Sequence, residues 1–366
     1  MAKFAEFERG SRVLAKSLLR IDPLEVTFAR RGFTCRKPEV QNRLEHVGQM
    51  FLQGYHLALG VADTLENDKL EDDKPEDLVA LAEQLNSNGP EFCGFAYEGA
   101  AMALALQDAL SLRGQRFQRF ASGPGRHHSY MLHVGYGWAC ARLPWQRFRL
   151  ESAVAKLDPV LRALAIDGFG FHEGYFHGHV KRQTSSRRMS EQTRHIFFQG
   201  QGRSLWFVHG ADAEKIAGAI AAMPPLYQSD AWSGVGLACA YAGGMLPDEL
   251  EPLRSLSGVH VAAVAQGVAF AAKARQLAGN PATHTENACV VFCRMSAADA
   301  AALCDQTFNQ LSSQHLCPYQ QWRELLRELL LSNASSSKPL FSKSMIARGK
   351  TDELITSPEL AAAESS

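Results

Sequence analysis

The chain has 366 residues, of which 46% are hydrophobic and 21% are charged, and this composition supports a large buried core. Lysine plus arginine equals aspartate plus glutamate at 38 each, so the net charge is zero and nothing points to nucleic-acid binding. The first twenty residues lack the apolar centre of a secretory signal, and no apolar run reaches the ~18 residues of a spanning helix. We expect a cytoplasmic protein whose contact with a membrane could only be peripheral.

Apolar residues recur at helical spacing along most of the chain. The predicted helices cover residues 43–59, 78–85, 98–112, 155–164, 213–222, 259–277, 297–310 and 319–331. Asp212 and Ser296 precede two of them and are suited to cap a helix N-terminus. A β-like run is found at residues 205–208, and no series of alternating strands accompanies it. The sequence therefore predicts an all-α protein with few or no strands.

Two segments differ in composition from the helical regions. Residues 63–91 are acidic and contain Pro75 and Pro90, which indicates a solvated insertion. Residues 332–366 are rich in serine, and we expect them to form a disordered tail. Residues 1–331 are then expected to form a single all-α domain that carries the acidic insertion.

A glycine followed by alternating small and larger apolar residues recurs along the chain. These lead glycines are Gly54, Gly94, Gly135, Gly168, Gly200, Gly234 and Gly267, at intervals of 40, 41, 33, 32, 34 and 33 residues. A period near 33 residues is typical of helical hairpins that stack on one another. We predict helical-hairpin repeats forming a solenoid or an α/α toroid, with the lead glycines at equivalent places in successive units.

Histidine and acidic residues are densest in FHEGYFHGH, which contains His172, Glu173, Tyr175, His177 and His179. Imidazole and carboxylate groups bind iron, zinc or copper, and imidazole also moves protons near neutral pH. The spacing is not that of H-E-x-x-H. Three interpretations remain open: a metal or haem bound through His172, His177 or His179, acid–base or substrate contacts without a metal, and a hydrogen-bonded structural role.

Glu98 lies in the apolar stretch GFAYEGAAMALAL, where burial of an ionised carboxylate is costly unless the group has a partner. The repeat places Glu98 four residues after its lead glycine and Glu173 five residues after its own. We predict that both converge in one cavity with at least one of His133, His172 and His177. A desolvated carboxyl beside an imidazole is suited to proton transfer. The alternative is a structural salt bridge to an arginine.

Two segments, GPGRHHSYMLHVG and GQGRSLWFVHG, place an arginine after two glycines and before an apolar run. These arginines, Arg126 and Arg203, are predicted to form buried ion pairs or to face a common pocket rather than solvent, where they could bind an anionic group of a substrate. A tight turn between helices is the alternative. Aromatic residues are expected to line an apolar substrate cavity or, alternatively, to form ordinary core; they are Tyr97, Tyr130, Trp138, Phe171, Tyr175, Trp206 and Trp232.

Several longer motifs, among them YMLHVGYGWACARLP, DGFGFHEGYFH and WSGVGLACAYAGG, resemble those of a bacterial family of unknown function that includes the UnbK/UnbL-type enediyne biosynthesis proteins. The resemblance covers about residues 28–330. It implies a role in antibiotic biosynthesis, in the secondary metabolism of an enediyne-type polyketide. It carries over no residue-level role.

The resemblance favours an accessory biosynthetic enzyme that acts on a long polyene or a similar hydrocarbon-like intermediate. Its expected partners are this apolar small molecule and other proteins of the enediyne cassette. The alternative is a non-catalytic helical-repeat scaffold that binds partner proteins of the pathway. A closed cavity with Glu98 and Glu173 would favour the enzyme, and an open groove with exposed aromatic residues would favour the scaffold.

Overall fold

The computed structural model describes residues 19–64, 75–111, 114–186, 189–312 and 317–336, with the side chains at 61–64, 75, 178–186 and 334–336 left out. Within these ranges every regular element is a helix, so the all-α prediction is confirmed. The long central helices are α3 (Pro38–Thr64), α5 (Cys93–Ala109), α7 (Ser129–Arg142), α10 (Arg162–Ser186), α11 (Glu191–Val208), α13 (Pro225–Ala242) and α15 (Val261–Ala278).

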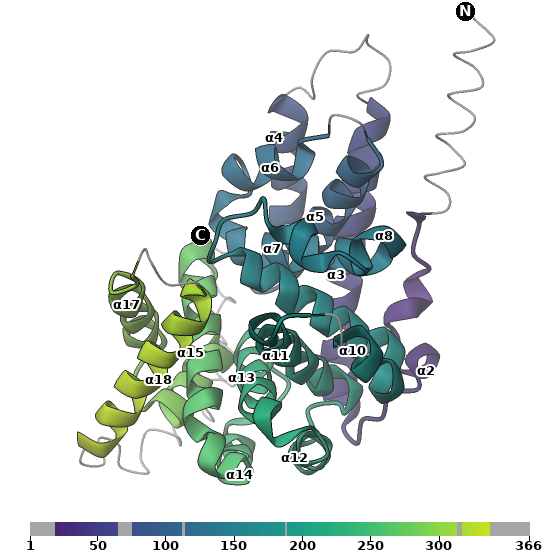
Figure 1. Cartoon of the computed structure of the whole chain (residues 1–366). Coiled ribbons are helices and arrows are strands. Elements are labelled where there is room, and N and C mark those ends of the chain that lie inside the picture. The colour runs from purple at the N-terminus through teal and green to yellow at the C-terminus, as the bar shows by residue number, and fades with distance from the viewer. Residues whose placement is uncertain (1–18, 65–74, 112–113, 187–188, 313–316, 337–366) are drawn as a thin grey trace, which may run out of the picture.

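Each central helix packs against the next one in chain order, so the chain advances sideways through the fold (Figure 1). The solenoid or toroid itself stays a prediction. The remaining elements join or cover the central helices: η1 (Pro23–Val26), α2 (Phe28–Arg31), α4 (Pro75–Asn86), α6 (Arg116–Ser122), η2 (Arg126–His128), α8 (Pro144–Arg147), α9 (Leu150–Val154), α12 (Ala213–Ala221), α14 (Pro247–Ser257), η3 (Gly258–His260), α16 (Thr283–Ala288), η4 (Cys289–Cys293), α17 (Ala297–Phe308) and α18 (Pro318–Ser336).

Local sequence signals account for several helix boundaries. The side chain of Asp212 accepts a hydrogen bond from the Lys215 N–H, and that of Ser296 accepts one from the Asp299 N–H, so both predicted caps are confirmed. Residues 155–164 were expected to be helical, but α10 begins only at Arg162. Asp158 is the reason, because its carboxylate accepts hydrogen bonds from backbone N–H groups just after it and holds a turn.

The predicted β-like run at residues 205–208 is wrong, because these residues lie inside α11. Leu205 and Trp206 are fully buried there. A short apolar run fits a buried helix as well as a buried strand, and periodicity alone does not separate the two.

Part of the acidic segment 63–91 belongs to the packed fold. Residues 75–86 form α4, and its Leu81 and Leu85 are fully buried. Residues 65–74 lie outside the described part of the chain, as do residues 337–366 of the predicted tail. The first residues of that tail, 332–336, continue α18.

Adjacent central helices approach each other closely at glycines. A Cβ atom added to Gly168, Gly200 or Gly234 would overlap a backbone carbonyl oxygen of the preceding central helix, at Val134, Asp167 and Gln199 respectively. Two residues further on, Gly170, Gly202 and Gly236 meet the following central helix in the same way, at Phe197, Ala231 and Val264. Only glycine permits this backbone approach, which explains why glycine is kept inside helices despite its low helix propensity.

Five of the seven lead glycines occupy equivalent places, as predicted: Gly135, Gly168, Gly200, Gly234 and Gly267. The prediction is wrong for the other two. In α5 the equivalent residue is Gly99, which meets the Phe51 carbonyl, whereas Gly94 faces the hydroxyl of Tyr241. Gly54 corresponds to the second glycine of the pair, because it meets the following helix at Ala96.

A buried polar residue precedes the lead glycine on several central helices, and in α5 it precedes the equivalent Gly99: Glu98, Asp167, Gln199, Ser233 and Gln266. We call this set the polar row. Gln199 donates to the Asp167 carboxylate at 2.8 Å, and Ser233 donates to the Gln266 side-chain oxygen at 3.0 Å. These bonds link neighbouring central helices through their buried side chains.

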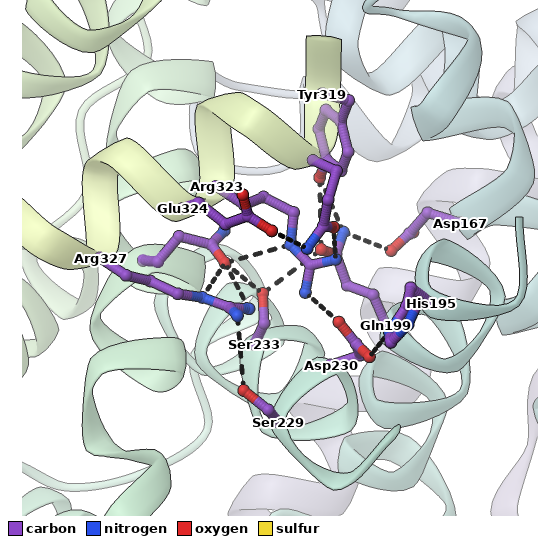
Figure 2. Close-up of polar contacts among 12 residues, drawn as sticks. Asp167, His195, Gln199, Ser229, Asp230, Ser233, Tyr319, Arg323, Glu324 and Arg327 are labelled. Carbon is purple, nitrogen blue, oxygen red and sulfur yellow. Dashed lines mark hydrogen bonds and ion pairs between the residues drawn. The ribbon is translucent and has the colours of Figure 1, made fainter. Parts of the chain in front are cut away.

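Helix α18 packs over the polar row. Figure 2 shows Tyr319, Arg323 and Arg327 extending from α18 toward it. Arg323 is paired with Asp230 at 2.6 Å, and the Arg327 guanidinium donates to Gln266 at 3.0 Å. The last described helix is therefore tied to the centre of the fold by buried charged contacts.

One helical stretch among the described residues is long and apolar enough to cross a membrane, Pro247–Ala278. It comprises α14, η3 and α15, and 61% of its most apolar window is buried inside the fold. The bent pair Thr283–Cys293 and Ala297–Phe308 passes the same test jointly. Core helices of soluble proteins also meet this criterion, so it is weak support for a span.

Candidate functional site

An apolar cavity lies among α3, α5, α7, α10, α11 and α13. Its free volume is about 70 Å³, within a larger space of about 820 Å³ that includes the mouth and part of the open solvent. One buried water needs roughly 10–15 Å³ of this free volume, so the cavity has room for several waters or a short stretch of an apolar chain. Its apolar lining includes Phe51, Phe95, Met102, Trp138, Phe171 and Tyr175.

Three buried polar side chains, Glu98, His172 and Arg203, interrupt this apolar lining. Burial raises the pKa of Glu98 to about 7, Arg203 lowers it, the nearby Asp167 raises it further, and the Trp138 indole N–H lowers it. Glu98 thus changes its protonation state near neutral pH, which is the property required of a general acid or base.

Arg203, which lines the cavity, is the counter-ion of a buried acid. Its Nε atom lies 3.1 Å from Oδ1 of Asp167, and its guanidinium lies 4.9 Å from the centre of the Phe171 ring. Burial raises the pKa of Asp167, while Arg203 lowers it. One buried guanidinium therefore stabilises the charged form of two buried acids, Asp167 and Glu98.

A second cluster, formed by His172, Glu173 and His177 on α10, adjoins the cavity. Nδ1 of His172 and Nδ1 of His177 lie 3.4 Å and 3.5 Å from the same carboxylate oxygen of Glu173, and Arg147 pairs with the other oxygen. Burial lowers the pKa of His172 to about 4, so this imidazole is neutral at pH 7. Two imidazoles and a carboxylate at this spacing form a candidate metal-binding set.

A family model matches residues 11–330. The chain belongs to the DUF1702 family. The members of this family are proteins of unknown function, as the sequence motifs had indicated. No curated protein and no solved structure matches the chain. The chemistry of this DUF1702 member therefore has to be inferred from its own residues.

The predicted convergence of acids and histidines is met in part. Glu98 and His172 come from α5 and α10 and line the same cavity. Glu173 is fully buried beside His172 but does not line the cavity. His133 lies elsewhere, because its Nδ1 contacts the Ser129 carbonyl oxygen at 2.7 Å. The side chain of His179 lies outside the described residues.

The two arginine segments differ in structure. Arg203 forms the expected buried ion pair, whereas Arg126 is exposed, so the prediction is wrong for Arg126. The reason is local: Gly200 and Gly202 lie within α11, while Gly125 directly precedes the short η2 turn. The similarity of the two segments does not extend to their conformation.

The predicted aromatic lining divides into two groups. Trp138, Phe171 and Tyr175 line the main cavity, and Tyr130 lines a smaller cavity next to it. The remaining residues are core residues that line neither cavity. Tyr97 donates to Asn86 at 3.1 Å, the Trp206 indole donates to the Gly243 carbonyl at 2.8 Å, and Trp232 is buried.

Sequence reasoning missed several polar residues at or near the cavity, among them Asp167, Arg142 and Tyr241. Asp167 could have been found from the sequence, because it precedes Gly168 as Glu98 precedes Gly99. The correct register of the repeat places the two acids at equivalent positions. Arg142 lies exposed at the end of α7 and also lines the cavity. Nothing local distinguishes it from the many arginines found at helix C-termini.

Replacing Glu98 with glutamine should stabilise the protein increasingly as the pH rises. The pKa of Glu98 is about 7 in the fold and about 4.5 in the unfolded chain, so the fold binds this proton more tightly. The stabilisation from this tighter proton binding is fully present below about pH 4.5. It amounts to about 3 kcal/mol and is lost as the pH rises to 7. Glutamine has nearly the same side-chain shape but does not titrate, so the variant does not lose this stability as the pH rises.

The measurement is thermal unfolding, followed by circular dichroism, at pH 5 and pH 8. The excess in melting temperature of Glu98→Gln over the unmodified protein should be larger at pH 8. Glu76→Gln, at an exposed position at the start of α4, is the control and should show no such change. An equal difference at both pH values would show that Glu98 does not have a raised pKa.

Proposed function

We propose that this protein is an accessory biosynthetic enzyme that binds a long polyene or a similar hydrocarbon-like molecule in its apolar cavity and moves a proton on it. The observation that carries the proposal is Glu98, a carboxyl group with a pKa of about 7 in a wall of apolar and aromatic side chains. Placement in an enediyne-type polyketide pathway is part of the proposal and rests on the resemblance of the sequence motifs.

The lining favours an unsaturated apolar ligand. Aromatic side chains such as Trp138 and Phe171 offer π faces for contact with conjugated double bonds, and few groups are available to hydrogen-bond a polar ligand. Burial of each methylene-sized group contributes about 0.8 kcal/mol before the costs of binding are subtracted. Arg142, exposed at the end of α7, offers a cation to a terminal carboxylate of such a ligand.

The chemistry proposed for Glu98 requires no oxidant. The ionised carboxylate removes a proton from a carbon next to a conjugated system, and the C–H electron pair becomes part of a new double bond. The protonated carboxyl then returns the proton to another carbon of the system, and a former π pair forms the new C–H bond. Arg203 stabilises the ionised carboxylate before the first step and after the second, when the carboxyl group has given up its proton.

A scaffold that binds partner proteins would present its aromatic residues in an open groove. Here Trp138, Phe171 and Tyr175 are each at most 8% exposed. This burial supports the enzyme over the scaffold, because a protein partner reaches only exposed side chains.

Binding can be tested with cis-parinaric acid, a fluorescent fatty acid with four conjugated double bonds. We expect its emission to rise with the unmodified protein and its affinity to fall at least about tenfold in Leu237→Trp. Leu237 lies on α13, lines the main cavity and is only partly buried, so an indole there would take up empty space. Leu226→Trp, at an exposed position on the same helix, is the control.

Proton transfer can be tested in heavy water, by mass spectrometry of the recovered tetraene. Deuterium should enter the ligand with the unmodified protein and not with Glu98→Gln, although the variant still binds it. Unchanged binding in a folded Leu237→Trp would contradict the cavity as the ligand site. Equal deuterium uptake in Glu98→Gln would contradict the role of Glu98.

A further inference from the structure

The cluster on α10 takes no part in the proton chemistry proposed for Glu98. We propose that His172, Glu173 and His177 bind a divalent first-row transition-metal ion, of the iron(II) or zinc(II) class, at the wall of the cavity. The proposal does not depend on which molecule occupies the cavity, because it concerns side chains of one helix. It rests on their spacing, on the burial of His172 and on the chemistry of the donor set.

The spacing of the donor atoms fits such an ion. Metal ions of this class bind imidazole nitrogen and carboxylate oxygen at about 2.0–2.2 Å, which places neighbouring ligand atoms roughly 3.0–3.5 Å apart. The two histidine Nδ1 atoms lie 3.4 Å and 3.5 Å from Oε1 of Glu173. All three donor atoms lie within 4.8 Å of one another, so a single ion can reach them with small side-chain adjustments.

His172 is the residue that most needs an additional partner. It is 3% exposed, its Nδ1 has only the long 3.4 Å contact with Glu173, and its Nε2 has no hydrogen-bond partner among the described residues. A buried polar group in this state is costly, and buried groups without a partner are rare in folded proteins. Trp138 and Phe176 pack against the ring at centroid distances of 5.5 Å and 4.7 Å, so the imidazole is held in place. Coordination of a metal would satisfy one of its nitrogens.

The donor set also indicates the class of ion. Two imidazoles and one carboxylate form the ligand set of non-haem iron(II) sites and of some catalytic zinc sites, which keep positions open for other ligands. His177 is 24% exposed, which gives an ion a route to the cluster, and His172 lines the cavity. A metal on this set would therefore lie between solvent and the apolar cavity.

The ion pair between Arg147 and Glu173 leads to a specific prediction about metal affinity at this site. Its guanidinium pairs with Oε2 of Glu173 and leaves Oε1 directed at the two histidines. This pairing orients the carboxylate, but the positive charge opposes a bound cation. Removing the charge in Arg147→Gln should therefore tighten metal binding by about three- to tenfold, whereas loss of a purely structural ion pair would only lower stability.

The test uses the purified full chain, stripped of metal with a chelator and titrated with cobalt(II) and then zinc(II). We expect one equivalent of cobalt(II) to produce a visible absorption band and zinc(II) to displace it. His172→Ala and the more conservative His177→Gln should each lose this band. His127→Ala, which removes an exposed imidazole in η2, is the control and should keep it.

Circular dichroism of the metal-free variants shows whether they are folded. The proposal is overturned if the unmodified protein gives no band, if both folded variants keep it, or if Arg147→Gln leaves the affinity unchanged. Parinarate binding, measured on the same metal-free samples, tests the apolar cavity separately. Loss of one property with the other retained therefore shows which of the two proposals fails.

Discussion

Replacing Gly200 with alanine is expected to lower the free energy of unfolding by about 3 kcal/mol or more. The added Cβ atom would overlap the carbonyl oxygen of Asp167 and crowd the backbone nitrogen of Phe171. Both are backbone atoms of α10, so no side chain can rotate away and the two helices have to separate. Urea unfolding, followed by circular dichroism, measures the loss.

The matched control is Gly218→Ala on α12. Gly218 is exposed, and a Cβ atom there would have no neighbour within 4 Å. Alanine should therefore stabilise the protein by up to about 1 kcal/mol, the usual gain over glycine in a helix. If the two variants changed stability alike, the close packing of α10 against α11 would be contradicted.

Replacing Arg203 with methionine is expected to destabilise the protein by about 3–5 kcal/mol at pH 8. Asp167 would keep a buried carboxylate without its counter-ion, and Glu98 would lose the same cation. Burial already raises the pKa of Asp167, and loss of Arg203 would raise it further. Stability from a raised pKa is present at low pH and lost as the pH rises, so the defect should be smaller at pH 5.

The double variant Asp167→Asn, Arg203→Met tests this explanation. It removes the buried charge that the single Arg203→Met variant leaves behind, and it should recover much of the lost stability at pH 8. A double-mutant cycle by urea unfolding gives the coupling free energy between the two residues. Simple additivity of the two single changes would mean that they do not interact in the fold.

The sequence predicted the fold better than it predicted the site. Apolar periodicity and caps such as Asp212 identify helices because these signals are local. The register of the repeat depends on contacts between helices. The sequence therefore points to Gly94 in place of Gly99, because nothing local shows which neighbouring helix a glycine faces. Only the contact with Phe51 distinguishes the two positions.

The candidate site was predictable where an ionisable side chain lies in a glycine-bearing apolar stretch. Glu98 and His172 were found for this reason, and both line the cavity. The partners of these groups were not predictable, because they come from other helices. Arg147 lies 26 residues before Glu173, and Asp167 lies 36 residues before Arg203. No local pattern links such pairs before the chain is folded.

The glycine contacts also determine how the cavity can respond to an occupant. Where the backbones of its wall helices already touch, as at Gly200 and Asp167, the walls can neither move closer nor slide by one residue without a steric clash. We therefore expect a rigid cavity that admits only molecules whose cross-section fits it. The short η1 turn, in contrast, contacts the wall through a side chain, because Val26 lies against Gly48 of α3 and lines the cavity.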